Sequence, residues 1–288
     1  MKRSVCLLTL FFLFAAAGQA ETLTFIGFGP TVPGLSPLNE NPQRASSGMG
    51  TALVTWDTVT SQMTVNVIFS GLTTPNTAAH IHCCINPPGN AGVATTVPTF
   101  TGFPGGVTSG VYSHSFDMSN ASSYNPAFVT SHGGTVVSAS AALLTGLQAG
   151  QSYLNIHTTQ FPGGEMRGFL LTPVDISIKP DAAAPVPINT RSRGKIPVAI
   201  LSTQSFNATS MVDPATVTFG RTGNEQSLDF CNSNGEDVNG DGLIDLVCHF
   251  DTELTGFKSG DTLGVLKAKT VQGGLPLVAQ EGIVTVPN

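Results

Sequence analysis

Alternation of apolar and polar residues is the dominant pattern along this chain. In the first half it recurs at residues 51–56, 63–69, 135–141, 152–157 and 166–171. A period of two residues places successive side chains on opposite faces of a β-strand. The chain contains no stretch of convincing length with the spacing of an amphipathic helix. The pattern therefore predicts an all-β protein, with long loops between residues 86 and 125, where Gly, Pro, Thr and Ser are frequent.

A second set of alternating segments follows Thr172 and Pro173. These segments are residues 174–178, 196–201, 216–219, 245–250, 262–268 and 282–286. We therefore predict two β-sandwich domains in tandem, immunoglobulin-like or superoxide-dismutase-like in fold, at residues 21–172 and 173–288.

The first 20 residues have the composition of a secretory signal peptide. Lys2 and Arg3 precede an apolar run, and small residues lead to a predicted cleavage after Ala20. No other apolar run reaches the roughly 18 residues that a membrane-spanning helix needs. We therefore predict a secreted or periplasmic protein without a transmembrane segment.

After removal of this peptide, ten basic residues remain against eighteen acidic ones, a net charge of −8. An acidic surface repels nucleic acid, which leaves an extracellular protein or a surface ligand as the expected kind of partner.

Four cysteines remain in the predicted mature chain, and an even count in an exported protein favours disulfides. A bond between Cys231 and Cys248 would close a loop of about 17 residues, which in the chain-entropy model stabilises by roughly 3 kcal/mol. Cys83 and Cys84 are adjacent. They could form a strained vicinal disulfide, stay as free thiols, or act as soft metal ligands beside His82.

Several short motifs occur in an order that resembles the CHRD domain, the module named after chordin. They are LNENP at 38–42, SGMG at 47–50, FSGL at 69–72, AHIH at 79–82, NIHT at 155–158 and FPGGEMRG at 161–168. The resemblance covers residues 22–172. It implies an exported β module: in animals the module occurs in a secreted protein that sequesters growth factors, and in bacteria it occurs in exported proteins whose biochemical role is mostly undefined.

Three histidines of these motifs are candidate metal ligands. His80 and His82 share one face of a strand, and His157 lies on a later strand that could be its neighbour. Three converging imidazoles suit copper or zinc. The structural alternative is that neutral, partly buried rings bond to backbone groups, while Glu165 and Arg167 form an ion pair across the sheet.

The segment from Phe69 to His82 also distantly resembles the strand of copper/zinc superoxide dismutases that carries two copper ligands as His-x-His. Those enzymes place a bridging histidine and a zinc cluster soon afterwards. Here no histidine occurs between His82 and His114, a departure that argues against a complete dismutase active site.

An acidic loop in the second half predicts a calcium site. Asp237, Asn239, Asp241, Leu243 and Asp245 occupy the positions of ligands 1, 3, 5, 7 and 9 of an EF-hand loop, with Gly242 at position 6. Position 12 is Cys248 where an EF-hand carries a bidentate Glu, so affinity should be weak, about 10⁻⁴ to 10⁻³ M. The alternative is a hairpin turn that binds nothing.

The rest of this half, including residues 178–180, 194–201 and 212–217, resembles a β-sandwich module that is often appended to exported bacterial proteins. It has no nucleophile–base–acid arrangement and no phosphate-binding glycine loop. We predict a secreted, non-enzymatic binding or structural protein with a calcium-stabilised second domain. The alternative is a copper- or zinc-binding protein, with a superoxide-dismutase-like redox site at His80, His82 and His157.

Overall fold

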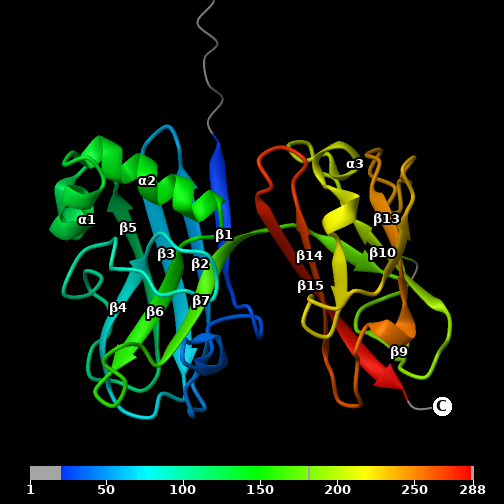
Figure 1. The fold of residues 1–288 in the computed structure, drawn as a ribbon, viewed down its shortest axis with the longest axis horizontal. Helices are drawn as coiled ribbons and strands as arrows, with labels where there is room; N and C mark the ends of the chain where they lie inside the picture. Colours follow the sequence, from blue (N-terminus) through cyan, green and yellow to red (C-terminus); the bar gives the residue numbers. More distant parts are fainter. Residues whose placement is uncertain (1–20, 181, 287–288) are drawn as a thin grey trace, which may run out of the picture.

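The computed structural model describes residues 21–180 and 182–286, and strands dominate both halves of the chain (Figure 1). The predicted signal peptide lies outside the described residues. The N-terminal half contains β1 (Thr22–Phe28), β2 (Met49–Asp57), β3 (Gln62–Ser70), β4 (Asn76–His82), β5 (Gly110–Asp117), β6 (Tyr153–Thr158) and β7 (Met166–Pro173), with helices α1 (Pro126–Ser131) and α2 (Val136–Gln148) and the 3-10 turns η1 (Pro37–Asn39) and η2 (Ala121–Ser123).

These seven strands pair antiparallel in the order β4-β6-β7-β1-β2-β3-β5. Alternation explains which side chains enter the core: on β3, Met63, Val65, Val67 and Phe69 are buried, while the residues between them are partly or fully exposed. Inward residues of β4 and β6, such as Ile81, belong to the same hydrophobic core. The opposite face of β4 and β6 is therefore available for polar side chains.

Helix α2 corrects the prediction of a strand at residues 135–141 and of a protein without a substantial helix. Thr135 and Ser138 form a capping box at its N-terminus, and Ala139, Leu143 and Leu147 bury one face at intervals of four residues. The first residues of the segment alternate between apolar and polar and include two valines. The spacing typical of a helix is therefore visible only when the whole segment is considered. Figure 1 shows α2 crossing the strands of the N-terminal half.

Strand β5 lies inside the segment for which long loops were predicted. Tyr112 and Phe116 enter the core from this strand, between residues that are mostly exposed. Its pairing with β3 over eight residue pairs makes it the edge of the sheet. The prediction was wrong here because Gly, Ser and Thr dominate the surrounding sequence and mask a short alternation.

The C-terminal half builds a second hydrophobic core from a separate set of elements. They are β8 (Ile176–Ile178), β9 (Val186–Asn189), β10 (Lys195–Ile200), α3 (Ala208–Met211), η3 (Pro214–Thr216), β11 (Thr218–Gly220), β12 (Leu228–Cys231), β13 (Leu246–Asp251), η4 (Thr252–Leu254), β14 (Leu263–Lys269) and β15 (Pro276–Val286). One four-stranded sheet has the order β12-β13-β10-β8, while β11, β14, β15 and β9 continue the larger sheet.

One sheet therefore runs through both halves of the chain, a feature that the tandem-domain prediction does not contain. The end of β7 pairs parallel with β15 at Leu277 and Val278. Phe28 and Val265 join Val278 in a small apolar cluster at this junction. Because backbone pairing and apolar packing both cross the junction, the two cores are joined by more than a linker.

Candidate functional site

The three predicted ligand histidines project from the same face of the β4–β6 pair. In the register, His80 lies opposite Asn155 and His82 opposite Tyr153. His157 is two residues beyond Asn155 on β6 and therefore shares its face. Strand pairing thus brings together histidine segments that are about 75 residues apart in the sequence.

The ring nitrogens of the three histidines converge on one point. One nitrogen from each ring lies within 4.8 Å of the other two, and the Nε2 atoms of His82 and His157 are 3.3 Å apart. Among residues 21–180 and 182–286, these are the three His, Cys, Asp or Glu side chains whose ligand atoms are grouped in this way. All three are nearly buried, with exposed fractions of 6% for His80, 7% for His82 and 8% for His157.

One nitrogen of each ring faces a backbone carbonyl. His80 Nε2 lies 2.6 Å from the oxygen of Pro98, and His82 Nδ1 lies 2.9 Å from the oxygen of Ala91. His157 Nδ1 is 3.0 Å from the oxygen of Pro162. A carbonyl only accepts, so each of these ring nitrogens carries the hydrogen. In the neutral rings, His80 Nδ1 and the Nε2 atoms of His82 and His157 therefore carry lone pairs.

One nitrogen of each ring thus makes the backbone contact that the structural alternative predicts, and the other nitrogen is left without such a contact. Contacts to backbone oxygens orient the imidazoles, which is how outer partners usually hold metal-binding histidines. His80 Nδ1 has no hydrogen-bond partner although it is buried. Two lone pairs that face each other at 3.3 Å repel unless a proton or a metal ion lies between them.

Burial keeps these rings neutral. It lowers the pKa of His80 to about 4 and the pKa of His82 to about 3, and it also lowers the pKa of His157. For His80 and His82 the neighbouring imidazoles add a smaller effect in the same direction. At neutral pH a shared proton is thus disfavoured, and the cluster presents three neutral nitrogen ligands.

Beside the histidines, on the same face of the sheet, lies a buried layer of polar and aromatic residues that includes Tyr153 and Arg167. The ring of Tyr153 stacks on His82 at 4.8 Å, and its hydroxyl lies 3.0 Å from the N–H and 3.2 Å from the oxygen of Ala91. The guanidinium of Arg167 lies over the other side of this layer, 4.7 Å from the Tyr153 ring. Tyr153 therefore fixes both the His82 ring and the carbonyl that orients it.

Arg167 is fully buried, and its carboxylate partner is Glu40 instead of the predicted Glu165. Its Nε is 3.7 Å from Glu40 Oε2 and donates to the oxygen of Asn39 at 2.7 Å. The two terminal nitrogens donate to the oxygens of Pro88 and Gly89 and to the side chain of Asn90. The guanidinium thereby anchors the loop that carries the Ala91 carbonyl.

Glu165 has a different role from the one predicted for it. Its Oε1 accepts hydrogen bonds from the hydroxyls of Ser46 and Thr73 and from the Thr73 N–H, and its Oε2 accepts from the Thr158 hydroxyl. These contacts tie the start of β7 to two loops. Sequence reasoning missed the Glu40–Arg167 pair because Glu40 carried no signal beyond its place in a family motif.

The predicted calcium loop is held by its own side chains. Asp237 Oδ1 accepts from the N–H groups of Gly240 and Asp241, and its Oδ2 accepts from Gly242. Asn239 bonds Asp241 through both its amide oxygen and its amide nitrogen. The loop is therefore wrapped around the Asp237 carboxylate.

Asp245, the fifth predicted ligand, is fully buried at the end of this loop. Its Oδ1 accepts from the Ser202 N–H at 2.7 Å and its Oδ2 from the Val238 N–H at 3.1 Å. Leu243 donates its own N–H to Asp241. A disulfide between Cys231 and Cys248 joins β12 to β13 at the base of the loop.

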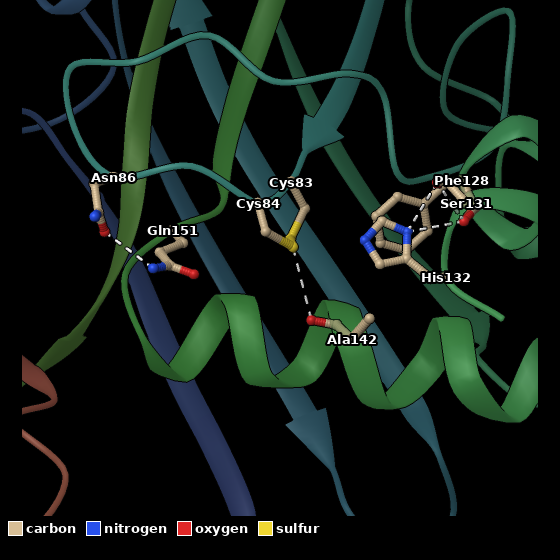
Figure 2. The surroundings of a disulfide bond; sticks show 8 residues. All are labelled: Cys83, Cys84, Asn86, Phe128, Ser131, His132, Ala142 and Gln151. Carbon is tan, nitrogen blue, oxygen red and sulfur yellow. Dashed lines mark hydrogen bonds between the residues drawn. A yellow bond between two sulfur atoms is a disulfide. The ribbon is translucent and has the colours of Figure 1, made fainter.

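The adjacent cysteines form a disulfide with each other, so they are neither free thiols nor metal ligands. They follow His82 directly but pack on the other side of the sheet, against α2 (Figure 2). A Cβ at Gly146 of this helix would collide with the Cys83 sulfur, so only glycine allows this approach. The disulfide thus serves the packing of α2.

A protein-family model matches the part of the chain that contains the histidine cluster. The fold and site define a β protein with buried, converging imidazoles. Residues 34–170 match the model of the CHRD domain. The match confirms the resemblance inferred from the motifs. Searches of curated proteins and of solved structures gave no match.

No helix among residues 21–180 and 182–286 is both long and apolar enough to cross a membrane.

Proposed function

We propose that this protein is an exported binding protein whose CHRD domain holds one transition-metal ion, zinc or copper, at His80, His82 and His157. The observation that carries the proposal is the pair of facing lone pairs on His82 and His157, with one nitrogen of His80 in the same group. A metal ion between His82 and His157 would satisfy both facing lone pairs, with His80 as the neighbouring third ligand.

The spacing between His82 and His157 suits such an ion. With metal–nitrogen bonds of about 2.0–2.1 Å, two nitrogens 3.3 Å apart subtend an angle of roughly 105–110° at the metal, close to tetrahedral. Neutral imidazole is a preferred ligand of both zinc and copper. Because backbone carbonyls already orient each ring, little side-chain entropy is lost when the ion binds.

Metal analysis of the protein purified without a histidine tag tests the proposal. We expect about one zinc or copper ion per chain, and a loss of that ion in His82→Ala with His157→Ala. An ion at a hundred times its Kd stabilises the folded state by about 2.7 kcal/mol, so chelation should lower the melting temperature by several degrees.

The matched control for the metal analysis is His114→Ala. His114 lies on β5 between Tyr112 and Phe116, outside the cluster, so this variant should keep the ion. A wild-type protein that neither carries nor takes up zinc or copper would contradict the proposal.

For the C-terminal half we propose weak calcium binding at the loop formed by Asp237, Asn239, Asp241, Leu243 and Asp245. Support comes from the organisation of the loop around Asp237 and from the disulfide at its base. Calcium at ten to a hundred times its Kd should raise the stability of this half by about 1.4–2.7 kcal/mol.

Thermal unfolding with and without calcium tests this second role. We expect a rise in melting temperature in the wild type and none in Asp237→Ala. Asp229→Asn is the control, because Asp229 lies on β12 and pairs with Lys195 outside the loop. An equal response to magnesium and calcium would count against a specific site.

A further inference from the structure

The histidine cluster supplies three ligands, and zinc or copper(II) ordinarily takes at least four. Within the described residues, the group of converging His, Cys, Asp and Glu atoms has no fourth member. Neither nearby carboxylate belongs to this group: Glu40 pairs with Arg167 through Oε2, and Glu165 accepts from Ser46, Thr73 and Thr158. One coordination position is thus left for a ligand from outside the cluster.

The charge of the site favours an anion in that position. Three neutral imidazoles leave the full double positive charge on the ion, and the buried guanidinium of Arg167 acts on His82 as a further positive group. Since no carboxylate joins the cluster, a negatively charged ligand is what would neutralise the site.

The cluster lies under a thin cover of protein. Each histidine keeps 6–8% of its surface exposed, while Ile81 and Ile156 on the other face of the same strands are fully buried. The loops that carry Ala91, Pro98 and Pro162 contact the ring nitrogens and cover the cluster. Because so little of the cluster is exposed, a ligand that enters it must consist of a few atoms.

We propose that the metal ion at His80, His82 and His157 keeps one exchangeable coordination position, held by water and open to small anions such as azide, halide or a simple carboxylate. This inference rests on the proposed metal site. No bond of the protein is made or broken when the ligand exchanges: a water leaves the ion as the anion binds.

Spectroscopy of the full chain loaded with one equivalent of cobalt(II) tests the inference, with azide as the probe. We expect the visible absorption of the bound cobalt to change with azide and to saturate at one azide per chain. His114→Ala should behave like the wild type. In His82→Ala with His157→Ala, neither cobalt binding nor the azide response should remain.

The outcomes separate the inference from the proposed function. Failure of the wild type to bind cobalt would overturn both. Cobalt that binds at the histidines but gives no response to azide would overturn the open position alone. Asn155, which lies opposite His80 and has an unpartnered buried oxygen, is the protein group best placed to fill it. A response to azide in Asn155→Ala but not in the wild type would assign the position to Asn155 and overturn the inference.

Discussion

Arg167→Ala is expected to lower the free energy of unfolding by about 3–5 kcal/mol, the usual cost of breaking a buried ion pair from one side. The substitution leaves the Glu40 carboxylate buried without its cation, and it removes the donors to Asn39, Pro88 and Gly89. Urea unfolding of the metal-free protein gives the measurement.

A double substitution distinguishes loss of charge pairing from loss of volume. When Glu40→Gln is added, no unpaired charge remains, so the double variant should lose less stability than Arg167→Ala alone. Arg193→Ala is the control, because Arg193 is exposed and pairs with Glu253 at the surface. If Arg167→Ala cost no more than Arg193→Ala, Arg167 would not hold the layer beneath the histidines together.

Arg167→Ala should also weaken metal binding. Arg167 holds Pro88, Gly89 and Asn90, and the adjoining Ala91 carbonyl orients His82. Loss of outer partners commonly reduces metal affinity by about 10- to 100-fold. The Arg167 side chain therefore links the position of this loop to the orientation of the His82 ring.

Glu40→Gln is expected to change how stability depends on pH. Burial raises the pKa of Glu40 to about 7, against the opposing effects of Arg167, Arg44, the Asn41 N–H and Asn155. A carboxyl whose pKa is raised by folding contributes stability that is complete below its unfolded pKa of 4.5 and is lost as pH rises through 7. The wild type should therefore lose about 2–3 kcal/mol from this group between pH 5 and pH 8.

The measurement is the difference in unfolding free energy between Glu40→Gln and the wild type at several pH values. Comparison with the wild type is needed because the lowered pKa values of His80 and His82 act in the opposite direction, removing stability as pH falls below 6.5. The difference should grow in favour of Glu40→Gln toward pH 8. Glu253→Gln, an exposed carboxylate, should run parallel to the wild type. Parallel curves for Glu40→Gln would show that Glu40 ionises normally.

Strands with a regular two-residue pattern were predictable from the sequence. Elements that are very short, or whose sequence mixes strand-like and helix-like spacing, were not. β3 and β10 alternate or are continuously apolar between turn residues, and both were found at or within one residue of their predicted bounds. α2 was missed because its first residues alternate like a strand, and its burial period of four residues is visible only after docking on the core. β9 and β12 are four-residue strands with too few positions to show a period.

That His80 and His82 share a face follows from their positions in the sequence, because side chains alternate along a strand. The CHRD motifs are likewise read directly from the sequence. The pairing of β4 with β6, the contact of one nitrogen of each imidazole with a backbone oxygen, and the pairing of Arg167 with Glu40 instead of Glu165 appear only in the folded structure. Local periodicity fixes the faces of a strand, whereas its neighbour and its register depend on contacts between residues far apart in the chain.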